Sequence, residues 1–243
     1  MRLKINYKTT RVPNSYRMMM VSLIKNALSE YNEDLFKSLY FYEDTIKNKK
    51  SKDFVFSVFL NNFKKEENDF LVEELSLNIS SPNKELIIHI YNALNRLKSY
   101  TYNNKYTLEK INIAIIQTKL IQSEYVLFKT MSPIVIRNKN GFFLDINSNE
   151  YIESLNYIVD TTLKNYRGYG LSKPLNFVPI DMKKVVLKEC IKSFTKNTNK
   201  KHICINSYKG IFALIGDSKD LNDIYMLGIG FRRNQGCGMI DII

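Results

Sequence analysis

Alternating apolar and polar residues mark the first strand of the chain, and a longer apolar period marks its first helix. From Arg2 to Lys8, the residues Leu3, Ile5 and Tyr7 fall on one face, which is the two-residue period of a half-buried strand. After a Pro-Asn-Ser start, apolar residues recur at helical spacing from Tyr16 to Leu28. The chain therefore begins with a predicted strand and a predicted amphipathic helix.

In the rest of the first half, segments with strand-like and helix-like spacing of apolar residues follow one another. The lysine-rich segment Lys47–Lys52 interrupts this pattern. The patterns predict a short helix at Asn32–Leu39, a strand with Phe54, Phe56, Val58 and Leu60 at strand period, a strand from Phe70 to Asn78, a helix from Ser81-Pro82 through Lys98, and a strand from Tyr106 to Gln117. Apart from the short helix, this order is βαββαβ.

In the second half, the same order of strands and helices is less clear. The patterns predict one or two short strands in Tyr125–Ile136, a strand at Gly141–Leu144, a helix at Asn149–Lys164, a hairpin of Lys183–Phe194 with Lys201–Ser207, a strand at Gly210–Ile215, a short helix at Ser218–Leu227 and a closing strand at Met239–Ile243. We therefore expect an α+β fold of two tandem ferredoxin-like (RRM-like) βαββαβ domains, residues 1–120 and 121–243.

Charge narrows the class of partner. Hydrophobic residues make up 44% of the 243 residues, which excludes a disordered chain, and the net charge of +12 favours a polyanionic partner such as nucleic acid or an acidic membrane surface. A lysine- and asparagine-rich composition is the alternative source of that charge. The three cysteines stand singly, and the N-terminus lacks a signal peptide, so we expect a cytoplasmic protein with reduced thiols and no bound metal or other cofactor.

A glycine-rich run near the C-terminus is the most specific motif. Residues 228–243 read GIGFRRNQGCGMIDII. Paired glycines around Arg232 and Arg233 suit a main-chain cradle for an anion, because glycine allows close approach and arginine binds phosphate through two hydrogen bonds. A strand is predicted after the run, and Gly-Lys-Ser/Thr is absent, so a nucleotide-cofactor loop is excluded. The alternative is a tight turn in which Gly230 and Gly236 serve backbone geometry alone.

Three segments in order resemble the CRISPR repeat-processing endoribonucleases of the Cas-six family, in the repeat-associated RNA-binding superfamily. Gly228–Gly238 is similar to the family's glycine-rich hallmark. Thr130–Ile134, with sequence TMSPI, resembles the opening of its second half, and Lys52–Ser57, with sequence KDFVFS, resembles one of its strands. The resemblance implies two ferredoxin-like domains and metal-independent cleavage of CRISPR repeat RNA, in which a 2′-hydroxyl attacks the adjacent phosphate to leave a 2′,3′-cyclic phosphate and a 5′-hydroxyl.

The same resemblance implies where the catalytic residues lie. Lys52 matches the family's lysine, Tyr40 stands where its usual histidine would be, and Lys25 stands where a tyrosine is usual. The two histidines, His89 and His202, lie elsewhere. We expect Lys52 and Lys25 to stabilise the phosphorane and Tyr40 to orient or protonate an oxygen; the alternative is that Tyr40 packs beside Phe36 and Phe41.

The missing histidine leaves a second hypothesis open: a non-cleaving CRISPR RNA-binding homologue, or a structural subunit of a surveillance complex. A basic protein that binds acidic membrane or DNA is a third, weaker hypothesis. Expected RNA contacts come from the glycine-rich run and the lysine-rich segment: Gly228, Gly230, Arg232, Arg233, Gly236, Gly238, Lys47, Lys49 and Lys50.

Overall fold

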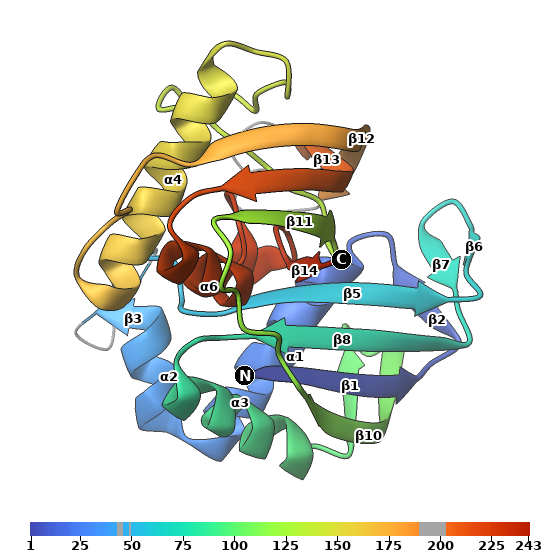
Figure 1. Ribbon diagram of the computed structural model, residues 1–243. Coiled ribbons are helices and arrows are strands. Elements are labelled where there is room, and N and C mark those ends of the chain that lie inside the picture. The colour runs from blue at the N-terminus through green and yellow to red at the C-terminus, as the bar shows by residue number, and fades with distance from the viewer. Residues whose placement is uncertain (43–45, 49, 190–202) are drawn as a thin grey trace. The chain divides into compact units, whose positions relative to one another are not determined.

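The chain forms two compact units in a computed structural model that describes all residues except 43–45, 49 and 190–202 (Figure 1). Unit 1 comprises Met1–Phe54 and Val58–Gln117, and unit 2 comprises Val55–Ser57 and Thr118–Ile243. Within the described part of the chain, no helix is both long enough and apolar enough to span a membrane.

Unit 1 is built on an antiparallel sheet in the order β5-β8-β1-β10-β9 (Figure 1). Its elements are β1 (Arg2–Lys8), β2 (Arg11–Pro13), α1 (Tyr16–Tyr31), α2 (Glu33–Tyr40), β3 (Phe41–Tyr42), β4 (Ile46–Lys47), β5 (Val55–Asn61), β6 (Lys64–Lys65), β7 (Asp69–Leu71), β8 (Glu74–Ser80), α3 (Lys84–Arg96), β9 (Ser99–Tyr102) and β10 (Tyr106–Ile116). Only the first three residues of β5, Val55–Ser57, are assigned to unit 2. The strands β10-β1-β8-β5 have the 4-1-3-2 order of a ferredoxin-like βαββαβ fold, as the sequence predicts.

Unit 2 repeats this topology. Its elements are β11 (Tyr125–Thr130), α4 (Glu150–Arg167), β12 (Asn176–Glu189), β13 (Ile203–Ile215), α6 (Ser218–Leu227), the 3-10 turn η1 (Arg233–Gln235) and β14 (Ile240–Ile242). The sheet order β12-β13-β11-β14 is again 4-1-3-2 when read from β14. The α+β class and the tandem ferredoxin-like fold are therefore confirmed, while the domain boundary at residues 120 and 121 stays a prediction.

Helix-side apolar residues form the core of each unit. In unit 1, Leu3, Ile5 and Tyr7 of β1 are buried, as the alternation predicts. In unit 2, the rings of Phe177, Phe212 and Phe128 stack across β12, β13 and β11 with centroid separations of 5.0 and 5.9 Å. Each such ring pair contributes about 0.5–1.5 kcal/mol beyond its buried area, so this ladder fixes the register of three neighbouring strands.

Two strand predictions are wrong. The single strand expected from Phe70 to Asn78 is two strands, β7 and β8, because the Val72 amide donates to the Thr10 carbonyl between them and β7 joins a separate sheet with β2 and β6. The strand expected at 141–144 is absent: the Asn138 side chain accepts from the Asn140 and Phe142 amides and forms a turn there, which leaves an isolated bridge between Arg137 and Phe143.

Other predicted elements exist with shifted ends. α3 begins at Lys84 rather than at the Ser-Pro pair, because the Asn83 side chain caps it by accepting from the Leu86 amide. The strand predicted at 210–215 is continuous with the preceding strand as β13, which pairs with β12 as the expected hairpin. Residues 190–194 of the predicted first hairpin strand, with 201 and 202 of the second, lie outside the described residues.

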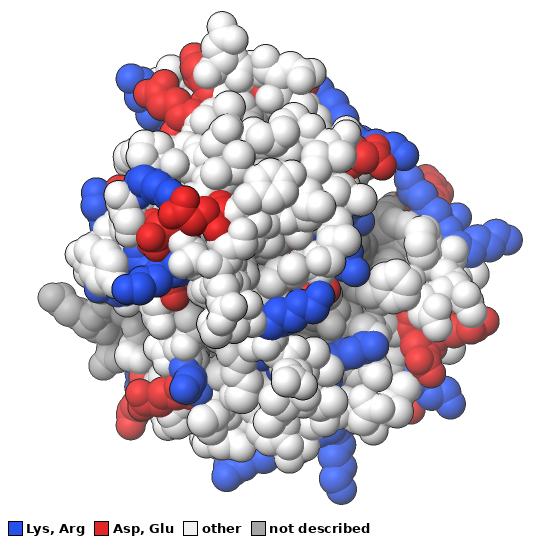
Figure 2. Space-filling view, in the orientation of Figure 1, with Lys and Arg blue, Asp and Glu red and all other residues white. Residues whose placement is uncertain are grey.

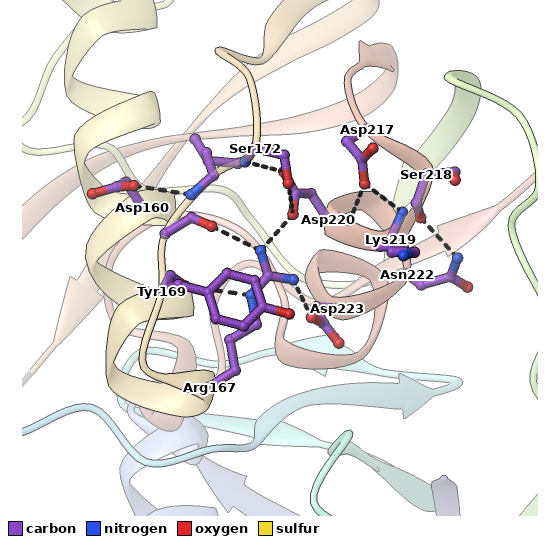
Figure 3. A network of polar contacts seen from close by, with 12 residues as sticks. Asp160, Arg167, Tyr169, Ser172, Asp217, Ser218, Lys219, Asp220, Asn222 and Asp223 are labelled. Carbon is purple, nitrogen blue, oxygen red and sulfur yellow. Dashed lines mark hydrogen bonds and ion pairs between the residues drawn. The ribbon is translucent and has the colours of Figure 1, made fainter.

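A buried ion-pair network joins the C-terminal end of α4 to α6 in unit 2 (Figure 3). The Arg167 guanidinium donates to the Asp220 carboxylate at 2.5 Å and to the Asp223 carboxylate at 2.6 Å. Asp220 is fully buried, and its other oxygen accepts from the Ser172 amide at 2.7 Å. Arg167 also donates to the Gly170 carbonyl, so one side chain holds the loop after α4 and the first turns of α6 together.

Candidate functional site

Lys25, Tyr40 and Lys52, which the sequence places far apart, lie around one aromatic ring in unit 1. The Lys25 ammonium lies 4.5 Å from the centroid of the Tyr40 ring, and the Lys52 ammonium lies 5.5 Å from it. Both distances fall within the range of cation–π attraction. The predicted catalytic trio is thus assembled in space, while its catalytic role stays a prediction.

The chain returns to Tyr40 by a short hairpin. Tyr40 is the last residue of α2, which is capped by the Asn32 side chain accepting from the Leu35 amide. Strands β3 and β4 then pair, and the Asn48 amide donates to the Tyr40 carbonyl at 2.8 Å. That hydrogen bond brings the lysine-rich segment back beside the end of α2, which explains why Lys52 lies near the ring.

Lys52 is buried and held by its own loop. Only 7% of the residue is exposed, and its ammonium donates to the Lys50 carbonyl at 2.7 Å and to the Asn48 carbonyl at 3.2 Å. Burial, followed by the nearby Lys25 ammonium, lowers the pKa of Lys52 to about 8, and Asp53 opposes part of this shift. The side chain is therefore a cation at neutral pH that can release a proton only slightly above it.

Tyr40 is half-buried, and it remains protonated at neutral pH. Burial of its hydroxyl raises the pKa of the phenol well above its usual value. Tyr40 also lies against the Phe36 ring, with centroids 5.2 Å apart, so the expected packing with Phe36 is present together with the two ammonium groups.

The glycine-rich loop packs against backbone of its own unit. A Cβ atom on Gly230 would lie 2.7 Å from the Val135 carbonyl oxygen, and one on Gly238 would lie 1.9 Å from that of Ile229. Both glycines have positive φ, and hydrogen bonds from Phe231 to Val135 and from Gly238 to Pro133 tie the loop to the segment after β11. Gly230 thus has the backbone role that the tight-turn alternative gives it, and Gly236, at φ 78°, ends the turn η1.

The two arginines of this loop differ. Arg233 is 3% exposed, and its guanidinium donates to the Leu227 carbonyl at 2.6 Å, where it satisfies the C-terminal end of α6. This bond gives Arg233 a structural role, and its expected contact with RNA stays a prediction. Arg232 lies nearer the surface in the left-handed region at φ 66°, with its guanidinium bonded to the Gln235 side chain. Contacts of Arg232, Gly228, Gly230, Gly236 and Gly238 with RNA stay predictions.

The lysine-rich segment is described only in part. Lys50 is exposed, whereas the side chain of Lys47 and the whole of Lys49 lie outside the described residues. On the face shown in Figure 2, Lys and Arg side chains form separate groups with acidic side chains between them. Net charge alone therefore does not locate a binding site, and the Lys25–Tyr40–Lys52 cluster is the best-defined candidate.

Comparison with known proteins identifies the family. Residues 115–242, just over half of the chain, match the family model described as CRISPR associated protein Cas6, C-terminal. The chain belongs to the Cas6 family. No protein in the curated set matches it.

Solved structures share the fold over the whole chain. A Cas6-related protein from Pyrococcus furiosus is 19% identical with a TM-score of 0.79, and 100% of this chain and 98% of that chain are covered. A RAMP protein described as binding different RNA substrates is 18% identical with a TM-score of 0.80, at 100% and 99% coverage. A CRISPR associated protein Cas6 is 19% identical with a TM-score of 0.74, at the same coverage. At these identities the matches establish the fold of this Cas6 protein.

Sequence reasoning missed the groups that hold Lys52. The carbonyls of Asn48 and Lys50 orient its ammonium, but every residue has a carbonyl, so no side-chain pattern could indicate them. The structural role of Arg233 in this Cas6 chain was missed for a related reason, because its bond to Leu227 depends on where α6 ends.

Proposed function

We propose that this Cas6 protein is a metal-independent endoribonuclease that binds CRISPR precursor RNA and cuts it within the repeats. The observation that carries the proposal is the pair of ammonium groups, Lys25 and Lys52, that both lie within 5.5 Å of the centroid of the Tyr40 ring. Two like charges gathered beside one ring destabilise each other, and a phosphate bound near them relieves that repulsion. The site thus suits the negative charge on the phosphorane oxygens during cleavage.

The chemistry can be assigned to these groups. The 2′-oxygen attacks the adjacent phosphorus, so the O2′–P bond forms as the P–O5′ bond breaks, and a 2′,3′-cyclic phosphate remains. The 2′ proton passes to solvent, and the 5′-oxygen takes a proton from the Lys52 ammonium, which solvent then restores. Lys25 stabilises the phosphorane, and the protonated Tyr40 hydroxyl donates a hydrogen bond to one of its oxygens.

The proposal is tested by incubating the protein in excess over cognate repeat RNA in the presence of a chelator. We expect cleavage at one position, with a cyclic phosphate on the upstream product and a 5′-hydroxyl on the downstream one, both identified by mass. RNA with a 2′-deoxy nucleotide at the scissile position is the matched control and should stay intact. Cleavage that needs added divalent metal, or that yields a 5′-phosphate, would exclude the mechanism.

A second function is favoured by Tyr40 itself, which stands where the family's histidine is usual and whose raised pKa excludes it as a base at neutral pH. In that case the protein is a non-cleaving CRISPR RNA-binding homologue or a subunit of a surveillance complex. Tight repeat binding without cleavage in the same assay would assign this function.

The pH dependence of cleavage should report on Lys52. Because the pKa of Lys52 is about 8, its side chain is mostly protonated at pH 7 and loses its proton as the pH rises through 8. We expect the plot of log single-turnover rate against pH to lose one unit of slope near pH 8. In Lys52→Arg, whose guanidinium stays charged, the bend should disappear. A bend at pH 8 that persists in Lys52→Arg would assign the titration to another group.

A further inference from the structure

Asn48 contacts three different groups of the candidate site. Its amide donates to the Tyr40 carbonyl at 2.8 Å. Its side-chain oxygen accepts from the Lys50 amide at 2.8 Å, and its own carbonyl accepts from the Lys52 ammonium at 3.2 Å. One residue thus connects the end of α2 to the loop that holds Lys52.

The contact with Tyr40 fixes where this loop begins. Tyr40 is the last residue of α2, and the last four carbonyls of a helix have no partner within that helix. The Asn48 amide satisfies one of these carbonyls directly after β4 ends at Lys47. The loop therefore leaves the β3–β4 hairpin at a defined point next to the residue whose ring both ammonium groups contact.

The side chain of Asn48 then shapes the loop. A bond from an asparagine oxygen to the amide two residues later closes an Asx turn, in which the side chain takes the place of a backbone group. The two residues that this bond joins, Asn48 and Lys50, are the same two whose carbonyls accept from the Lys52 ammonium, at 3.2 and 2.7 Å. The turn therefore brings two acceptors to one ammonium.

Most of the charges around the Lys52 ammonium oppose its placement. Burial disfavours the charged form, and Lys25 from α1 and Lys50 from the same loop repel it. Asp53 attracts it, and the neutral Tyr40 ring of α2 adds a cation–π contact. Because burial and repulsion favour an ammonium that turns to solvent, its carbonyl acceptors have to be held in place by the loop.

We propose that Asn48 is a positioning residue for cleavage, because its Asx turn sets where the Lys52 ammonium lies. The expected effect on the rate rests on the proposed function, whereas the expected effect on the location of Lys52 does not. Asn48 acts through Lys52 and need not touch the RNA. Without the turn, the loop at 48–52 loses its fixed path and Lys52 turns to solvent.

The location of Lys52 is tested without RNA, by NMR titration of the full chain labelled with ¹³C-lysine. The signal of Lys52 is identified by its loss in Lys52→Met. We expect the pKa of Lys52 to rise from about 8 in the wild type to above about 9 in Asn48→Ala, toward the ordinary value of about 10.4, because the ammonium is no longer buried. Asn48→Ser should give a value between the two, since a hydroxyl closes such a turn more weakly.

A turn of the same kind in unit 2 provides the matched control. The Asn138 side chain accepts from the Asn140 amide at 3.1 Å. Asn138→Ala removes this bond, and it should leave Lys52 titrating as in the wild type. A thermal melt that matches the wild type verifies that each variant is folded.

Cleavage tests the same role through its effect on the rate. In Asn48→Ala, the single-turnover rate at pH 7 should fall by about 10²-fold, the cost of misplacing a reacting group by about 1 Å. The bend in the pH profile should move from near pH 8 to above about 9. In a Lys52→Met background, Asn48→Ala should change the rate by less than about twofold, since its effect passes through the ammonium that is already missing.

The outcomes separate this proposal from the proposed function. A folded Asn48→Ala or Asn48→Ser protein in which Lys52 titrates as in the wild type would overturn the proposal, whether or not the protein cleaves RNA. Rate losses of Asn48→Ala and Lys52→Met that multiply in the double variant would also overturn it. A wild type that does not cleave repeat RNA would exclude the proposed function alone, and the titration would still decide whether Asn48 places Lys52.

Discussion

Replacing Lys52 by methionine should lower the single-turnover rate of repeat RNA cleavage by about 10²–10⁴-fold, the usual cost of losing a positioned general acid. Methionine retains an unbranched stem that can fill the buried position of Lys52, so the loss reports on the ammonium rather than on packing. The rate is measured with protein in excess over radiolabelled repeat RNA.

Two further variants make the result specific. Lys65→Ala removes an exposed lysine of β6, outside the proposed site, and should cleave at the wild-type rate. Tyr40→Phe retains the ring that both ammonium groups contact and removes only the hydroxyl, so it separates the proposed hydrogen bond from packing against Phe36. A Lys52→Met protein that cleaves at the wild-type rate would remove Lys52 from the mechanism.

Replacing Arg167 by alanine should lower the free energy of unfolding by about 3–5 kcal/mol, because it leaves the buried carboxylate of Asp220 without its counter-charge. The loss is a large share of the stability of an ordinary domain. It is measured by urea denaturation monitored by circular dichroism. The expected unfolding is that of unit 2, where all members of the network lie (Figure 3).

An exposed ion pair in the same region provides the control. Lys164 pairs with Asp160 one turn apart on α4, and the Lys164 side chain is 60% exposed. Lys164→Ala should therefore change the free energy of unfolding by less than about 1 kcal/mol. If Arg167→Ala is no more destabilising than Lys164→Ala, the buried network does not stabilise the fold as we describe.

Most of the fold could be predicted from local patterns because each strand and helix buries one face. The alternation in β1 and the helical period of α1 depend only on neighbours along the chain. The errors arose where a contact with a residue distant in the sequence determines where a strand begins or ends. The break between β7 and β8 depends on a bond from Val72 to Thr10, which no period within the segment reveals.

The residues of the candidate site could be named from the sequence, but the shifts of their pKa values could not. Lys25, Tyr40 and Lys52 came from family resemblance, and the fold brings them together. The pKa of Tyr40 depends on burial, and that of Lys52 depends on burial and on the position of Lys25. The direction of each pKa shift therefore follows only from the three-dimensional structure. The bond from Arg233 to the end of α6 could not be predicted, because an arginine beside glycines has the same sequence pattern whether it contacts a ligand or its own helix end.

The packing of Gly230 and Gly238 against backbone carbonyls has a consequence for recognising relatives of this protein. These glycines are demanded by the architecture of unit 2, so a homologue that has lost its chemistry must still keep them in order to fold. A search built on the glycine run will therefore gather active and inactive descendants alike. To distinguish nucleases from non-cleaving RNA-binding homologues, the residues equivalent to Lys25, Tyr40 and Lys52 must be compared in each protein.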